Sequence, residues 1–180
     1  MRDAFHRPTA DAGPADADTV ARNAAATRRF AEEVLGRGDM AAFEELVADD
    51  VWVSTGLKPD APITSKAEYA QVIGSTLGVA LSNGTMTVHE VLPTLDGAVV
   101  VRFTAEADHT GELDGIAPTG ERFVLSETHL MRFRDGKLVQ NHVGALNPLH
   151  WEMTFAPVIA PKILRRPGGN REAGSGVVPG

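Results

Sequence analysis

The sequence predicts an α+β fold in which three N-terminal helices pack in a curved antiparallel sheet that encloses an apolar pocket. Over the first part of the chain, apolar residues recur at helical spacing, with one short strand pattern before the third helix. From Thr85 on, Val-, Thr- and Phe-rich segments alternate with turns that contain Gly. Helices and strands gathered in separate blocks are typical of α+β proteins, and a sheet wrapped over helices forms a cone around its inner face.

Length and composition favour one soluble globular domain. The chain has 180 residues, of which 43% are hydrophobic and 23% are charged, which is ordinary for such a domain and long enough to bury a core. The Ala-, Asp-, Pro- and Gly-rich start and the Gly-rich end lack periodicity. We expect flexible tails at residues 1–17 and 165–180 around a domain at 18–164.

Charge and cysteine usage exclude several functional classes. The net charge is −7 and basic residues are scattered, which argues against nucleic acid and membrane surfaces as partners. The chain has no cysteine, so disulfides, thiolate metal sites and cysteine nucleophiles are excluded. A secretory signal and an apolar run of the ~20 residues that a membrane helix needs are both missing. We therefore expect a cytoplasmic protein.

Each predicted helix begins at a side chain that can cap it. Asp18 or Thr19 caps the first, which runs to Leu35; Asp39 caps a short second helix; Ser65 and Glu68 form a capping box for the third, Lys66 to about Leu77. A brief strand, Val51 to Thr55, separates the last two helices.

Four longer strands follow. Thr85 to Leu92 and Ala98 to Thr110 flank a turn at 95–97, after another turn at 82–84. A hairpin over Glu121 to Val143 turns at residues 134–137. Trp151 to Leu164 is expected to pack as a closing segment.

The strongest chemical signal lies on the first strand of this hairpin. Glu127 and His129 are two residues apart, so they share one face of the strand. A carboxylate beside an imidazole on an apolar hairpin can move a proton next to a carbonyl group. The structural alternative is that Glu127 pairs with Arg132 or Arg122 across the sheet edge.

The length of the hairpin loop decides which residues of the last strand oppose this pair. A two-residue loop of type I′ would place His142 opposite His129. A three-residue loop would place Asn141 opposite His129 and Val143 opposite Glu127. We favour the three-residue loop, with His142 pointing away from the pocket.

Several runs of sequence resemble the SnoaL-like polyketide cyclases. They are H-T-G-E-L-D-G-I-A-P-T-G-E-R-F, S-E-T-H-L-M-R-F-R-D-G-K-L, and the earlier L-V-A-D-D-V-W-V and D-G-A-V-V-V-R-F-T. The resemblance spans roughly Thr19 to Leu149. It implies the cone-shaped α+β barrel shared with ketosteroid isomerase and nuclear transport factor 2, and a homodimer paired through the outer sheet face.

The resemblance places some family residues in this chain and shows one departure. His129 matches the family's H-L-M-R histidine, and Glu127 matches the polar residue before it. Asn141 replaces a family histidine, and Val143 replaces the aspartate that acts as acid and base in the aldol cyclases. In the comparison with ketosteroid isomerase, Thr55 takes the place of the base, and His129 again falls in the pocket.

We therefore expect a cofactor-independent cyclase or isomerase of a hydrophobic polyketide-like molecule. Glu127 and His129 would handle protons, and Asn141 would donate a hydrogen bond to a developing oxyanion. The expected substrate contacts are Trp52, Ser54, Met131 and Val143. Trp52 fits a pocket wall and ordinary core equally well.

Two other functions stay open. A small-molecule binding protein that has lost catalysis is consistent with valine at position 143. An epoxide hydrolase or dehydratase would use Arg102 and Glu106, which share strand parity. The six histidines show no metal-ligand spacing on one element, so we expect no metal and no cofactor.

Overall fold

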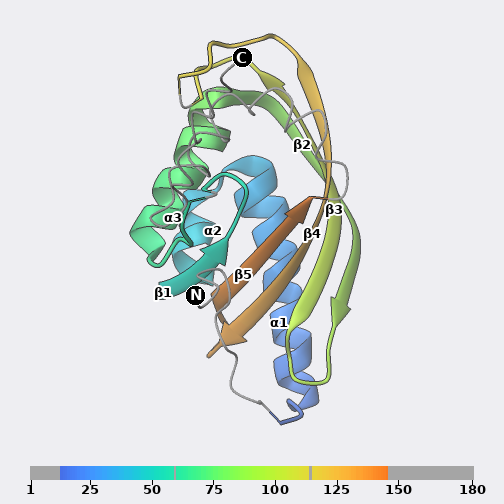
Figure 1. Ribbon diagram of the computed structural model, residues 1–180. Helices are drawn as coiled ribbons and strands as arrows, with labels where there is room; N and C mark the ends of the chain where they lie inside the picture. The colour runs from blue at the N-terminus through green and yellow to red at the C-terminus, as the bar shows by residue number, and fades with distance from the viewer. Residues whose placement is uncertain (1–12, 59, 114, 146–180) are drawn as a thin grey trace, which may run out of the picture.

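The computed structural model describes residues 13–58, 60–113 and 115–145, which form helices packed against a curved five-stranded sheet (Figure 1). The helices are α1 (Ala17–Arg29), α2 (Met40–Leu46) and α3 (Lys66–Ile73), and π-helical turns η1 (Phe30–Leu35) and η2 (Gly74–Ala80) extend α1 and α3. The strands are β1 (Val47–Ser54), β2 (Leu81–Pro93), β3 (Val99–His109), β4 (Arg122–Arg134) and β5 (Lys137–Ala145). The predicted α+β class is confirmed.

The sheet differs from the prediction in two respects. Its strand order is β1-β5-β4-β3-β2, so β1 and β2 form open edges and the described sheet is curved but not closed. Strands β2 to β5 pair antiparallel, whereas β1 pairs parallel with β5. A parallel pair needs a long crossover, and here α3 and three strands lie between the two partners.

The first helix begins earlier than predicted. Asp16, rather than Asp18 or Thr19, is the N-cap, and its carboxylate accepts a hydrogen bond from the backbone N–H of Thr19 at 2.8 Å. The backbone N–H of Ala15 donates to the carbonyl of Leu95 at 2.8 Å. Ala15 is thus held against the β2–β3 turn, while residues 1–12, the segment 151–164 and the tail 165–180 lie outside the described residues.

The other two caps are confirmed. Asp39 accepts hydrogen bonds from the N–H groups of Ala41 and Ala42, and Ser65 accepts one from Glu68. The turn predicted at 82–84 is instead an irregularity within β2, where Asn83 has a φ of 49°. Asparagine tolerates this left-handed conformation, so the strand continues through it.

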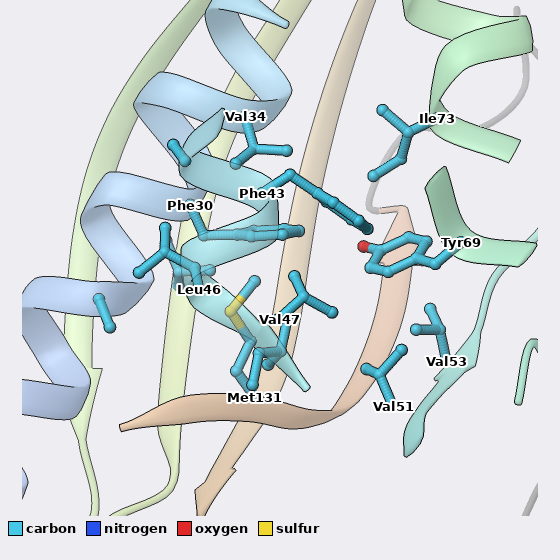
Figure 2. Packing of buried hydrophobic residues seen from close by; sticks show 14 of the residues in the cluster. Phe30, Val34, Phe43, Leu46, Val47, Val51, Val53, Tyr69, Ile73 and Met131 are labelled. Atoms are coloured by element: carbon cyan, nitrogen blue, oxygen red, sulfur yellow. The ribbon is translucent and has the colours of Figure 1, made fainter. Parts of the chain in front are cut away.

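The core lies between the helices and the inner face of the sheet (Figure 2). Within it, Tyr69 of α3 lies against two phenylalanine rings. Its ring centroid is 6.1 Å from that of Phe30 and 5.6 Å from that of Phe43, the latter edge-on. These contacts hold the tyrosine ring in place inside the apolar cluster.

Candidate active site

The β4–β5 hairpin has a different loop from the one we favoured. Arg134 pairs with Lys137, which leaves the two-residue loop of Asp135 (φ 53°) and Gly136 (φ 77°). Two successive left-handed residues are typical of a type I′ turn, so the prediction of a three-residue loop is wrong. At the start of β5, just after this turn, the alternate side chains therefore point to the opposite sheet face from the one that we expected.

A β-bulge further along β5 then returns the later side chains to the expected faces. The pairing skips Val139 on β5, so that His129 faces Val143 and Leu130 faces His142. One extra residue in a strand moves every later side chain to the other face. Asn141 and Val143 therefore share the inner face with His129, as predicted, although each lies two positions from its predicted partner.

Four polar side chains form a hydrogen-bonded series on this inner face. Glu127 Oε2 lies 3.2 Å from His129 Nε2. Asn141 Nδ2 lies 3.2 Å from His129 Nδ1 and 3.2 Å from the hydroxyl of Tyr69. His129, Asn141 and Tyr69 are buried, whereas the Glu127 side chain keeps 17% of its surface exposed. The series thus runs from the core to a carboxylate at its outer end.

The contacts assign a direction to each hydrogen bond. The Asn141 amide nitrogen has two hydrogens, and it donates to Tyr69 and to His129 Nδ1. His129 Nδ1 is then an acceptor, so the ring proton is on Nε2 and is donated to Glu127. Oε1 of Glu127 has no hydrogen-bond partner among the described residues. Among the described residues, one oxygen of Glu127 is therefore held by His129 and the other is not held by a side chain or backbone group.

Tyr69 is a member of the site that the sequence did not indicate. Burial raises the pKa of its phenol, the hydrogen bond from Asn141 lowers it, and the charge of Glu127 raises it further. Since the net shift is upward, the hydroxyl stays protonated at neutral pH. The sequence feature that could have indicated it is the tyrosine itself, because a tyrosine hydroxyl buried in a core needs a polar partner.

The structure does not have the alternative in which Glu127 pairs with Arg132 or Arg122. Arg132 binds Asp96 at 2.7 Å, and Arg122 binds Asp108 at 2.8 Å. Both arginines thus pair with carboxylates other than Glu127. Within the described structure, the Glu127 carboxylate contacts His129 instead.

Two of the four expected substrate contacts lie beside this series. Met131 follows His129 on the inner face of β4 and is fully buried in the core. Val143 lies directly across from His129 and packs against the same core. The ring of Phe103 meets the His129 ring edge-on at 4.9 Å. The polar series is therefore enclosed by apolar side chains.

The other two lie on the opposite face of the sheet, so their predicted place in the pocket is revised. Trp52 pairs with Gln140, and Ser54 pairs with His142. Ser54 Oγ lies 3.2 Å from His142 Nδ1, and Gln140 Nε2 lies 2.8 Å from His142 Nε2. The ring of Trp52 lies 5.1 Å from that of His142. Side chains alternate along β1, so either Trp52 and Ser54 or Val51 and Val53 can face inward. In the structure, the two valines face inward.

The residues proposed for an epoxide-hydrolase-like site are also on the outer face. Arg102 binds Glu90 at 2.8 Å, and Glu106 binds Arg122 at 3.1 Å. Both are more than a third exposed. They therefore form no common site with Glu127, which pairs with inward-facing Phe103.

In the ranges 13–58, 60–113 and 115–145, no three His, Asp or Glu side chains are close enough together to hold a metal ion. None of the helices in these ranges has the length and apolar character to cross a membrane.

Comparison with known proteins identifies the family. Residues 25–144, well over half of the 180, match the family model described as SnoaL-like polyketide cyclase. None of the curated proteins matches.

Solved structures agree in fold. A candidate SnoaL-like polyketide cyclase from Jannaschia sp. CCS1 has a TM-score of 0.65 at 14% identity, covering 84% of this chain and 99% of that one. AclR from Streptomyces galilaeus has a TM-score of 0.63 at 22% identity, with coverage of 77% and 98%. IdmH from Streptomyces antibioticus, a candidate polyketide cyclase, has a TM-score of 0.61 at 23% identity, with coverage of 74% and 98%. The chain belongs to the SnoaL-like polyketide cyclase family.

Proposed function

We propose that this protein is a cofactor-independent cyclase or isomerase of a polyketide or related hydrophobic intermediate, with Glu127 as its acid and base. Membership of a cyclase family supports the reaction type. The observation that carries the residue assignment is the part-buried hydrogen bond between Glu127 and His129 on the inner face. It gives the chain an oriented carboxylate despite valine at position 143.

The position of Glu127 suits it to replace the missing aspartate. Val143 pairs with His129, so Glu127, two residues before His129, is its diagonal neighbour across the sheet. Diagonal neighbours of this kind lie roughly 7–8 Å apart, within reach of a long side chain. A glutamate on β4 can thus serve the space that an aspartate on β5 serves in the aldol cyclases.

The proposed chemistry is proton transfer next to a carbonyl group. Glu127 Oε1 removes a proton from the carbon, and the electron pair of the C–H bond forms an enolate. The enolate carbon attacks a second carbonyl of the same molecule, which forms the ring bond, and the resulting alkoxide takes the proton back from Glu127. His129 holds the other carboxylate oxygen and thereby fixes the direction of Oε1.

Apolar surroundings support this role. The Phe103 ring lies edge-on to the imidazole of His129, Val143 lies directly across from His129 on β5, and Met131 follows His129 on the inner face of β4. Such side chains keep water from the enolate and fold a flexible substrate into one reactive conformer. The enolate would therefore persist long enough to form the ring.

A non-catalytic binding protein of the same fold is the second reading. The observation that favours it is valine at position 143, where the aldol cyclases have aspartate. On that reading, the Glu127–His129 hydrogen bond only satisfies two buried polar groups. The protein would then bind the same hydrophobic molecules without converting them.

The test compares turnover with binding for a linear poly-β-carbonyl precursor. We expect Glu127→Gln to lower turnover by about 100-fold or more, while the outer-face control Glu106→Gln keeps wild-type turnover. Equal turnover by Glu127→Gln and wild type would contradict proton transfer by Glu127. Binding of the precursor by wild type with no turnover would favour the binding protein.

A further inference from the structure

Among the described residues, one buried atom of the inner-face series has no hydrogen-bond partner. Asn141 Oδ1 is buried and accepts no hydrogen bond within the described residues, while the nitrogen of the same amide donates two. Leaving a buried acceptor unpaired costs about 1–3 kcal/mol, and native proteins contain few such atoms. An unpaired oxygen beside a proposed catalytic pair therefore needs a physical reason.

The neighbours of Asn141 hold the amide in this orientation. Tyr69 lies against Phe30 and Phe43, which fix its hydroxyl on one side of the amide. On the other side, His129 uses Nε2–H to reach Glu127 and leaves Nδ1 as an acceptor. Turning the amide over would direct Oδ1 at that acceptor nitrogen, which is repulsive. The nitrogen therefore faces Tyr69 and His129, and Oδ1 is left over.

We propose that Asn141 Oδ1 accepts a hydrogen bond from a hydroxyl group of the bound substrate, so that the site selects enolic or phenolic molecules. This inference rests on the proposed function and names the substrate class of the same site. It reverses the role expected from the sequence, because both Asn141 donors are already used and none is left for an oxyanion.

The position of the oxygen fits an enolic substrate. Asn141 pairs with Met131, one inner-face step from His129 and two from Glu127. A hydroxyl bound there would hold one end of an enolised dicarbonyl while its acidic carbon lies toward Glu127. Since Oδ1 is shielded in this structure, an inner-face side chain must shift to admit the ligand. Half-buried Val143, two residues along β5, is placed to do so.

The tautomer of His129 tests the orientation directly. In protein labelled with ¹⁵N-histidine, we expect His129 Nδ1 to be unprotonated and Nε2 to be protonated at neutral pH. The spectrum of His129→Gln identifies the signals among the six histidines of the chain. The opposite tautomer would mean that Oδ1 accepts a hydrogen bond from Nδ1–H, and it would overturn the proposal.

A pair of matched probes tests the selectivity. We expect wild type to bind 2-naphthol about tenfold more tightly than 2-methoxynaphthalene, which has the same ring system but no donor. The ratio should fall to about one in Asn141→Leu and persist in Gln140→Leu, which removes an amide from the opposite face. Titration calorimetry gives the affinities, and circular dichroism checks the fold of each variant.

The outcomes separate this inference from the proposed function. Equal binding of both probes by wild type, or no binding of either at millimolar concentration, would overturn the inference whatever the variants do. If Glu127→Gln also abolished turnover, the proposed function would stand without it. Conversely, tenfold selectivity together with unchanged turnover in Glu127→Gln would support the hydroxyl site and reject the catalytic role of Glu127.

Discussion

Two histidines that are almost neighbours across β4 and β5 lie in different chemical surroundings. His129 is 2% exposed and contacts a carboxylate and an amide on the inner face. His142, across from the next residue of β4, contacts the hydroxyl of Ser54 and the amide of Gln140 on the outer face. The same side chain thus lies between a carboxylate and an amide on one face and in a hydroxyl–amide cluster on the other.

A single residue decides whether His142 shares the inner face with His129. The type I′ loop alone would place His142 opposite His129, and the bulge at Val139 prevents it. The difference between the two faces therefore depends on backbone geometry near the turn, some distance from the polar groups themselves.

Deleting Val139 should have the largest effect. Without the bulge residue, either the strand slips and turns Asn141 and Val143 outward, or the loop distorts to keep them inside. The slip buries polar groups without partners and the distortion strains the turn, so we expect a loss of about 3–5 kcal/mol in the free energy of unfolding. Urea denaturation measures it, with Val139→Ala as a control that keeps the residue count. Equal stability of the deletion and wild type would show that the bulge does not set the face.

Alanine substitution of the two histidines should differ in its effect. His129→Ala leaves a cavity and removes the partners of Glu127 and Asn141, so we expect a loss of about 2–4 kcal/mol. His142→Ala should cost about 1 kcal/mol, because its side chain is only half-buried. Thermal and urea unfolding give both values. Similar losses in the two variants would contradict the contrast between the faces.

The local features of the molecule were predictable, whereas the non-local ones were not. Caps at Asp39 and Ser65 depend on a few adjacent residues, and the shared face of Glu127 and His129 follows from strand periodicity. The partnership of Tyr69 with Asn141 joins elements 72 residues apart, which no local pattern reports. The parallel pairing of β1 and the inward face of its valines are likewise decided by the sheet as a whole. The homodimer and the cytoplasmic location stay predictions.

Tyr69 allows a spectroscopic check on burial, since it is the only tyrosine of the chain. Its pKa is raised above the ordinary 10.0, mainly by burial. Above that pH an unfolded chain releases the proton and the native state keeps it, so stability falls as pH rises. We expect no phenolate absorbance near pH 10.5 until the protein unfolds. Phenolate absorbance in the folded protein at that pH would show that Tyr69 is reached by solvent.

The matching variant, Tyr69→Phe, isolates the hydroxyl. It leaves one N–H of Asn141 unpaired in the core, for an expected loss of about 1–2 kcal/mol. The same change should remove the loss of stability above pH 10, measured by urea unfolding at neutral and alkaline pH. An unchanged alkaline loss would assign it to other groups.

The smallest effect concerns the β2–β3 turn on the periphery. Hydrogen bonds from Thr94 and Arg132 lower the pKa of Asp96 to about 2. A lowered pKa stabilises the fold above the unfolded value of 3.8 and loses this contribution as pH falls toward 2. Because the side chain is 31% exposed, we expect Asp96→Asn to cost only about 1 kcal/mol at pH 7. The difference in melting temperature between variant and wild type should be smaller at pH 3 than at pH 7; an unchanged difference would contradict the linkage.

The most direct test of the account is turnover of a linear poly-β-carbonyl precursor by Glu127→Gln and His142→Ala, measured side by side with wild type. If the inner face carries the chemistry, Glu127→Gln loses about 100-fold or more, and His142→Ala turns over the precursor at the wild-type rate. Full activity in Glu127→Gln, or an equal loss in both variants, would contradict it.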